Sequence, residues 1–548
     1  MFQKNDIVEL KITDITNEGE GVGKVDGFTF FVKDALVGDE ASVRVTKVKK
    51  TYGYGRLEKL LSPCKDRITP RCPIARQCGG CQIQAMSYEG QLRFKESKVR
   101  NNLIRLGGFD ETLINGIIEP IIGGPEFEYR NKAQFPFGTD KDNNPICGFY
   151  AGRTHSIISN TDCALGVSEN QEILEIILEW MKKNQISAYD ETTHRGLIRH
   201  VLIRKGFHSG EVMVCLVINA KKVPHSEELI GKLTKVTGMK SISLSVNEAD
   251  TNVIMGDNFR VLWGSSTIED TLLGLRFNIS PLSFYQVNPV QVEKLYGTAI
   301  EYAGLSGTEE VWDLCCGIGT ITLAMAPSAG SVHGIEIVPQ AIEDAKENAG
   351  LNGITNAEFI AAAVEEYLPQ NASKIRADVI VMDPPRKGMD EKALEVVVSA
   401  APDRIVYVSC DSATLARDLK YLCANGYELK RVRPVDMFPQ TVHVETVVLL
   451  SQLRHKPDDY IDVDVDVAEL EGTSAETKAT YEKIKKYVAE HNDGMKVSNL
   501  YIAQVKRKCG IELAESFNLP KSEDSRQPQC PKEKAEAIME ALRHYRMI

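Results

Sequence analysis

The sequence of 548 residues predicts a multidomain α/β protein. Three observations support this prediction: short strands with glycine turns at the N-terminus, a cluster of cysteines after them, and apolar strands that alternate with helical segments further on. In chain order we expect an OB-like β-barrel over 1–62, a central α+β domain with the cysteine cluster over 63–280, a Rossmann-like domain over 281–454 and a small helical extension over 455–548.

The N-terminal segment alternates apolar and polar residues in Ile7–Ile12 and continues with strand-like runs at Phe28–Val32 and Ala41–Val48. Glycines at three nearby positions allow tight turns between these strands, namely Gly19, Gly21 and Gly23. Short strands joined by such turns are typical of small barrels. The segment resembles the TRAM domain, an OB-like module that binds RNA.

The charge of the chain is uneven. The net charge is −11, yet Ala41–Phe135 carries 17 lysines and arginines against 9 acidic residues. A locally basic surface can bind phosphates despite a negative total, and Tyr52 and Tyr54 could stack on exposed bases. An ordinary solvated surface is the alternative interpretation of these charges.

A compact group of cysteines, Cys72, Cys78 and Cys81, follows the spacing C-x5-C-x2-C. Such spacing allows several thiolates to face one centre, and both an iron–sulfur cluster and zinc satisfy it. We expect no disulfide framework, because the N-terminus lacks a secretory signal and many of the 13 cysteines lie in apolar strands. Beyond the cysteines, a helix is expected near Tyr88–Leu106 and strands at Leu197–Arg204 and Glu211–Val217.

A nucleoside site is predicted where an apolar strand ends in Asp313 and a glycine turn, Gly317-Ile318-Gly319, begins the next helix. A second strand ends in Glu336, seventeen residues after Gly319, and its carboxylate suits two ribose hydroxyls. Thr322 replaces the third glycine of the dinucleotide motif. The pattern therefore favours S-adenosylmethionine over NAD.

Polar residues end two further strands. Asp383 opens Asp-Pro-Pro-Arg, whose prolines fix a rigid turn, and Cys410 follows the strand Arg404–Ser409 where a helix begins. A helix N-terminus favours thiolate, so Cys410 is a candidate nucleophile, and from its position alone a buried structural cysteine is an equal alternative. Glu445 precedes another apolar strand. A nitrogen target needs no enzyme thiol, whereas an aromatic-like carbon does.

Together these segments resemble the catalytic domain of the RNA uracil-C5 methyltransferases. The resemblance rests on Ser283–Asn288, Asp313–Thr320, Glu336, Asp383–Arg386, Tyr407–Cys410 and His443–Glu445, in the family's order. It implies that Cys410 is the nucleophile and Glu445 the base. It also implies a cofactor site formed by Gln286, Cys315, Thr320, Glu336, Ala363 and Asp383.

The ribosomal-RNA branch of this family carries a [4Fe–4S] cluster. The resemblance implies that Cys72, Cys78, Cys81 and Cys163 hold it, and it favours iron–sulfur over zinc. Tyr129–Lys132 and Gly196–His200 also resemble family segments, and we expect them to shape the RNA cleft without a catalytic role.

The barrel and the cysteines point, by family resemblance, to 23S ribosomal RNA as substrate. Transfer RNA is the alternative substrate, and a noncatalytic iron–sulfur RNA-binding or ribosome-assembly factor is the alternative function. We expect a cytoplasmic monomer with no membrane segment. In the tail, Asp458–Asp466 predicts an acidic linker or edge strand, and Glu476–His491 and Glu533–Tyr545 predict helices of unknown role.

Overall fold

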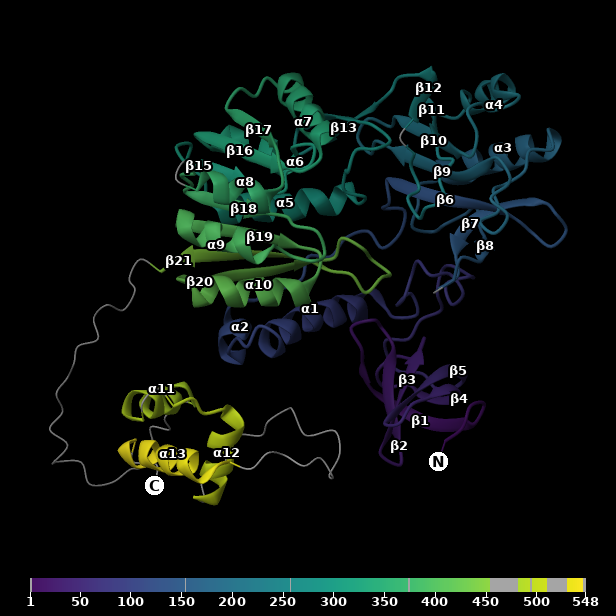
Figure 1. The fold of residues 1–548 in the computed structure, drawn as a ribbon. Coiled ribbons are helices and arrows are strands. Elements are labelled where there is room, and N and C mark those ends of the chain that lie inside the picture. The colour runs from purple at the N-terminus through teal and green to yellow at the C-terminus, as the bar shows by residue number, and fades with distance from the viewer. Residues whose placement is uncertain are drawn as a thin grey trace. The chain divides into compact units, whose positions relative to one another are not determined.

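A computed structural model describes residues 2–152, 154–256, 258–372, 375–453, 481–492, 495–509 and 530–545 (Figure 1). The chain forms two compact units, Met1–Lys456 and Pro457–Ile548. The acidic segment Asp458–Asp466 lies outside the described residues. The expected multidomain α/β architecture with an N-terminal barrel and a Rossmann-like part is confirmed, while the domain boundaries stay a prediction.

The N-terminal barrel is closed, with strand order β1-β2-β3-β5-β4. Its strands are β1 (Ile7–Ile15), β2 (Gly21–Val25), β3 (Phe28–Lys33), β4 (Glu40–Val48) and β5 (Tyr52–Ser62). Alternating residues of these strands fill the interior, as the period of two in the sequence requires. Closure leaves no unpaired sheet edge.

The central part is a seven-stranded sheet of order β12-β11-β10-β9-β6-β7-β8. Its strands are β6 (Lys132–Thr139), β7 (Pro145–Tyr150), β8 (Ile157–Ser159), β9 (Ile198–Lys205), β10 (Val212–Ile218), β11 (Met239–Val246) and β12 (Asn258–Gly264). Helices α3 (Glu169–Lys183) and α4 (Ser226–Leu233) contribute to the core of this sheet. A hairpin of β13 (Ile268–Leu272) and β14 (Leu275–Ile279) leads into the next part.

The Rossmann-like part contains a second seven-stranded sheet, of order β17-β16-β15-β18-β19-β21-β20. The parallel strands are β15 (Glu310–Asp313), β16 (Ser331–Glu336), β17 (Ala357–Ala361), β18 (Val379–Met382) and β19 (Arg404–Ser409). The last two strands, β20 (Tyr427–Val435) and β21 (Glu445–Gln452), run antiparallel to their neighbours. The central parallel strands β18 and β19 are nearly continuous apolar runs because both faces of the sheet are buried there.

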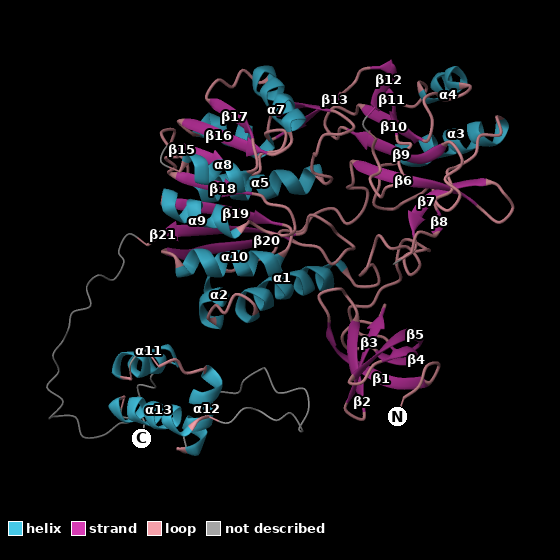
Figure 2. Cartoon of the chain, in the orientation of Figure 1, coloured by secondary structure: helices cyan, strands magenta, loops and turns pink. Residues whose placement is uncertain are grey.

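Helices cover both faces of this sheet (Figure 2). One core holds α5 (Pro289–Ala303), α6 (Thr320–Met325), the short 3-10 turn η1 (Ala326–Ser328) and α7 (Pro339–Leu351). The other holds α8 (Val364–Asn371), α9 (Glu391–Ala400), α10 (Ser412–Ala424), α1 (Tyr88–Arg105) and α2 (Glu111–Ile117). The helix expected near Tyr88 is therefore present, and it packs against α10 and β20.

The C-terminal unit consists, in its described part, of α11 (Tyr481–His491), α12 (Asn499–Lys508) and α13 (Lys532–His544). Apolar residues of all three helices share one small core. Tyr487 stacks on His491 with ring centroids 4.0 Å apart. In the described parts of both units, no helix is long and apolar enough to cross a membrane.

A buried ion pair joins α1 to the segment between β20 and β21. Lys95 donates through Nζ to Asp436 Oδ1 over 2.5 Å and to the Phe438 carbonyl over 2.9 Å, and both charged side chains are fully buried. The pair connects residues 341 positions apart. Removing one partner would leave the other charge buried and uncompensated, which is costly.

We therefore expect Lys95→Met to lower the free energy of unfolding by about 3–5 kcal/mol. The change is measured as the shift of the urea unfolding midpoint, with Lys420→Met on the exposed side of α10 as the matched control. The double variant Lys95→Met/Asp436→Leu should recover most of this loss, because no charge is left unpaired. Equal midpoints for Lys95→Met and Lys420→Met would contradict the assigned role of the pair.

Candidate active site

The topology of the sheet brings the polar strand ends to one edge. Asp313 ends β15 and Glu336 ends β16, while Asp383 and Cys410 directly follow β18 and β19. Strand β21 runs in the opposite direction, so its first residue, Glu445, lies at the same edge. Open α/β sheets bind their ligands at this edge.

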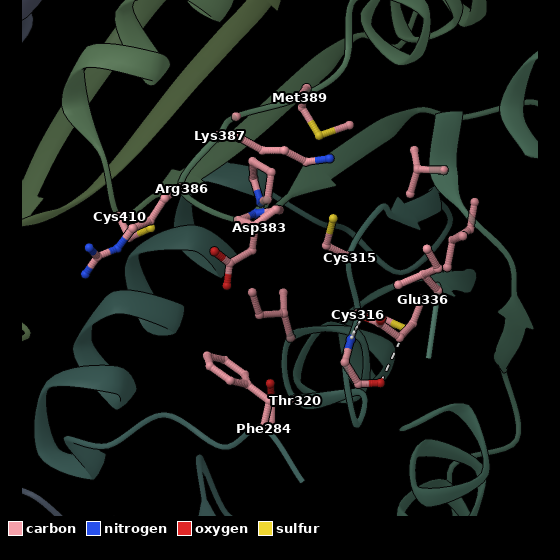
Figure 3. Close-up of a pocket in the computed structure, with 18 of the residues that line it drawn as sticks. Phe284, Cys315, Cys316, Thr320, Glu336, Asp383, Arg386, Lys387, Met389 and Cys410 are labelled. Atoms are coloured by element: carbon pink, nitrogen blue, oxygen red, sulfur yellow. Dashed lines mark hydrogen bonds between the residues drawn. The ribbon is translucent and has the colours of Figure 1, made fainter. Parts of the chain in front are cut away.

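A cavity of about 640 Å³ opens at this edge. All eight residues that the sequence assigned to catalysis or to the cofactor line it, namely Gln286, Cys315, Thr320, Glu336, Ala363, Asp383, Cys410 and Glu445. Figure 3 shows Cys410 and Arg386 on one side of the hollow and Glu336 on the other, with Asp383, Cys315 and Thr320 between them. The structure thus brings the predicted residues together, and their individual roles stay predictions.

The glycine turn forms one end of the cavity. Gly317 and Gly319 have φ values of +54° and +83°, which a side chain would strain. Glu336 accepts hydrogen bonds from the backbone N–H of Gly317 at 3.2 Å and of Val338 at 3.0 Å. These bonds fix the carboxylate beside the turn, where it can accept further bonds from ribose hydroxyls.

Thr322 takes the place of a third glycine for a structural reason. Its hydroxyl donates to Asp313 Oδ2 over 2.6 Å, and both side chains are fully buried. Burial raises the pKa of Asp313 to about 6. The bond stabilises the first residue of the turn, which a glycine could not do.

Tyr296 of α5 organises two of the predicted cofactor residues. Thr320 donates its hydroxyl hydrogen to the Tyr296 hydroxyl over 3.4 Å, and Gln286 also hydrogen-bonds with that hydroxyl. Sequence reasoning missed this residue, although it lies on the helix that follows Ser283–Asn288. Cys315 and Ala363 bring no strong polar group to the cavity wall, so they can contribute mainly packing.

The other end of the cavity is acidic and poorly solvated. Burial and the nearby Asp383 raise the pKa of Glu445 to about 8. Burial and the nearby Asp313 raise the pKa of Asp383 to about 7. A cationic ligand would relieve this repulsion. The donor set therefore fits S-adenosylmethionine, with Glu336 suited to its ribose and the two acids to its positive sulfonium.

The expected bias of Cys410 toward thiolate is wrong for the protein without ligands. Burial, with Glu445 and Asp383 nearby, raises the pKa of Cys410 to about 12. The helix N-terminus is already satisfied, because the Asp411 carboxylate accepts from the backbone N–H of Ala413 at 2.8 Å and of Thr414 at 3.2 Å. The sequence placed Cys410 at the start of the helix, whereas Asp411 is the cap.

Other residues of the cavity wall were not assigned a role from sequence. They include Phe284, Arg386, Lys387, Met389, Phe438 and His443. Arg386 is the cation that lowers the pKa of both Cys410 and Glu445 against the effect of burial. Its position directly after Asp-Pro-Pro, at the end of a strand, could have identified Arg386 as a residue of the site. Phe438 carried no such signal, because it lies in the loop between β20 and β21.

The four predicted cluster ligands lie within electrostatic reach of one another. Cys163, Cys78 and Cys72 all contribute to the raised pKa of Cys81, which burial brings to about 12. The Cys78 sulfur accepts from the Gly80 N–H over 3.4 Å, and the Gln84 amide donates to the Cys81 sulfur over 3.5 Å. Within the described ranges, however, no three His, Cys, Asp or Glu side chains are gathered closely enough to hold a single metal ion.

Comparisons with known proteins agree with this geometry. Residues 266–453 match the model of the tRNA (uracil-5-)-methyltransferase family, and residues 2–57 match the TRAM domain. An uncharacterized RNA methyltransferase of Halalkalibacterium halodurans is 47% identical and aligns over 82% of this chain and 97% of its own length. A second, from Clostridium tetani, is 46% identical over 83% of this chain and 98% of its own length.

A solved structure supports the same assignment. The tRNA (uracil-54, C5)-methyltransferase of Pyrococcus abyssi, in complex with S-adenosyl-L-homocysteine, is 27% identical with a TM-score of 0.64. It covers 81% of this chain and all of its own chain. The unit from Pro457 onward lies beyond the end of the matched family model. The chain belongs to the S-adenosylmethionine-dependent RNA uracil-C5 methyltransferases that carry a TRAM domain.

Proposed function

We propose that this protein methylates C5 of a uridine in 23S ribosomal RNA through a covalent adduct on Cys410. One observation carries the proposal: the pairing of β19 with β21 sets a thiol and a carboxylate beside one cavity whose other end fits a nucleoside. A noncatalytic RNA-binding factor would not need this combination. The arrangement therefore favours an enzyme.

The chemistry follows from the weak nucleophilicity of uracil C5. Addition of the Cys410 thiolate to C6 makes C5 enolate-like, and C5 then forms a bond to the methyl carbon of the donor. S-adenosylmethionine supplies that carbon on a positively charged sulfur, which leaves as a neutral thioether. Glu445 removes the C5 proton, the C6–S bond breaks and the thiolate is restored.

Proton release from Cys410 must accompany ligand binding. With its pKa raised to about 12, the thiol is protonated at neutral pH. A positive charge near Asp383 and Glu445 would offset the repulsion that holds protons in the site. Because Cys410 loses its proton only when ligands bind, the thiol is protected from unproductive reactions before the substrate arrives.

Transfer RNA is the second candidate substrate. The Pyrococcus abyssi enzyme is named for a tRNA uridine, and its match covers 81% of this chain, more than the methyltransferase domain alone. The parts that precede the methyltransferase domain therefore do not separate the two substrates. The choice of ribosomal RNA as the substrate rests on the resemblance to the ribosomal-RNA branch of the family.

We further propose that Cys72, Cys78, Cys81 and Cys163 hold a [4Fe–4S] cluster. Cys163, Cys78 and Cys72 all lie close enough to Cys81 to contribute to its raised pKa. Their C-x5-C-x2-C spacing, with a distant fourth cysteine, resembles that of the ribosomal-RNA branch of the family, which carries such a cluster. Hydrogen bonds to the sulfurs of Cys78 and Cys81 suit such a cluster.

The substrate is tested by transferring labelled methyl groups from S-adenosylmethionine to 23S rRNA and tRNA transcripts, followed by mapping of the modified uridine. We expect 5-methyluridine in 23S rRNA, and at least a 1,000-fold loss of rate (roughly 4 kcal/mol) in Cys410→Ala. Binding of S-adenosylmethionine by that variant should be unchanged. Modification of tRNA alone would establish the second candidate, and full turnover by Cys410→Ala would exclude the covalent mechanism.

For Glu445→Gln we expect accumulation of a covalent RNA–protein adduct, because the methylated intermediate cannot lose its C5 proton. The adduct is detected as a mass shift that survives denaturation. In the double variant Cys410→Ala/Glu445→Gln the shift should be absent. Clean release of methylated RNA by Glu445→Gln would assign the base to another group.

The cluster is tested by anaerobic purification with iron, zinc and sulfide analysis. We expect about four irons per chain and a broad visible absorbance, both reduced in Cys81→Ser and unchanged in Cys215→Ser, a buried cysteine of β10. A colourless protein with one zinc per chain would refute this proposal.

A further inference from the structure

The central sheet contains an unfavourable pair of cations. Lys132 opens β6 and lies directly opposite Arg204 of β9 in the antiparallel register. Like charges in opposite positions of an antiparallel pair destabilise a sheet. Arg130, two residues before Lys132, adds a third positive charge that Lys132 senses. Positive charges that lower the stability of the sheet in this way indicate that these residues serve a function.

No described acidic group offsets this charge. Arg204 is 1% exposed and donates to two neutral acceptors, the carbonyls of Ser280 at 3.3 Å and of Ser283 at 2.9 Å. Its Nε is buried without a partner among the described residues. Lys132 and Arg130 are half-buried, and in the same described ranges neither side chain has an ion pair. Arg130, Lys132 and Arg204 can therefore bind an anion.

These three cations lie beside the active-site cavity. Asn131, between the two half-buried cations, donates its backbone N–H to the Val287 carbonyl at 2.9 Å and its side-chain amide to the Gln286 carbonyl at 3.0 Å. Gln286 lines the cavity. On the other side, the Arg130 N–H donates to the Leu165 carbonyl, two residues after Cys163. The extended segment therefore runs between the cavity and the cysteines.

We propose that Arg130 and Lys132 bind the phosphate backbone of the RNA strand next to the target uridine. A nucleotide flipped into the cavity must leave its neighbouring phosphates at the cavity mouth. A guanidinium and an ammonium group without acidic partners are suited to those phosphates. Arg204 adds positive charge and holds the Ser280–Ser283 turn that leads to Gln286. The inference rests on the proposed function, because it assigns a subsite for the same RNA.

The salt dependence of binding tests the proposal. Binding of a 23S rRNA transcript and of a tRNA transcript is measured between 50 and 200 mM salt for the wild type, Arg130→Met and Lys132→Met. Each variant should lower the slope of log K against log salt by about 0.7–0.9. Lys141→Met, an exposed change in the β6–β7 turn of the same sheet, is the matched control and should leave the slope unchanged.

A pH series separates phosphate binding from a structural role. Burial, together with Arg204 and Arg130, lowers the pKa of Lys132 to about 8. A bound phosphate would raise that pKa again, so wild-type affinity should fall by about fourfold from pH 6.5 to 8.5 as the free lysine loses its proton. Lys132→Arg keeps its charge and should remove this loss.

Stability provides the opposite readout. Lys132→Met removes an unpaired, half-buried charge, so its thermal midpoint should stay equal or rise while RNA affinity falls. A lowered midpoint together with a wild-type salt slope would make Lys132 a structural residue and overturn the proposal. If the proposed function is wrong, no transcript will contain 5-methyluridine. The slopes of log K against log salt can still be measured in that case, so the two failures are distinguishable.

Discussion

The register between β19 and β21 is the constraint on which the reactive site depends. Ser409 pairs with Thr446 in this antiparallel ladder, so the next position sets Cys410 opposite Glu445. The residues are 35 positions apart in the sequence. A slip of one residue would move Glu445 by about 3.3 Å and turn its side chain to the other face. Burial of both faces of the sheet opposes such a slip, and the apolar core thereby fixes the chemistry.

The same arrangement explains the electrostatics of the cavity. Bringing strand ends together gathers Asp313, Glu336, Asp383 and Glu445 at one edge of the sheet, where the last three line the cavity. Arg386 is the cation that lowers the pKa of both Glu445 and Cys410. Burial and a neighbouring carboxylate raise the pKa of Asp383 and of Glu445, and the thiol stays protonated. A neutral methyl donor would leave this repulsion in place, whereas a sulfonium offsets it. The fold thus selects for a positively charged donor.

The strand pattern alone predicted Glu336, Asp383 and Cys410, whereas Gln286, Cys315, Thr320 and Ala363 were predicted from the family resemblance. Asp383 and Cys410 could be placed from the strands before them, and Glu336 from its distance to the glycine turn. The protonation of Cys410 could not, since its raised pKa depends on burial in the folded protein and on Glu445 and Asp383 from other strands. Tyr296 was missed for a similar reason: its hydroxyl matters only when helix α5 packs beside the turn.

The loop between β20 and β21 shows why directional bonds hold this site. The Asp436 carboxylate accepts a hydrogen bond from Lys95, and the Pro439 carbonyl accepts one from the Tyr129 hydroxyl. Gln440 and Gln91 are joined by two hydrogen bonds, one donated by each residue. These donors come from α1 and from the segment that leads to Lys132, and none is near the loop in sequence. Apolar packing tolerates small displacements, whereas buried hydrogen bonds and charges are costly when misaligned. A loop that ends in Glu445 therefore gains a defined position from polar contacts, at the expense of requiring every partner to be present.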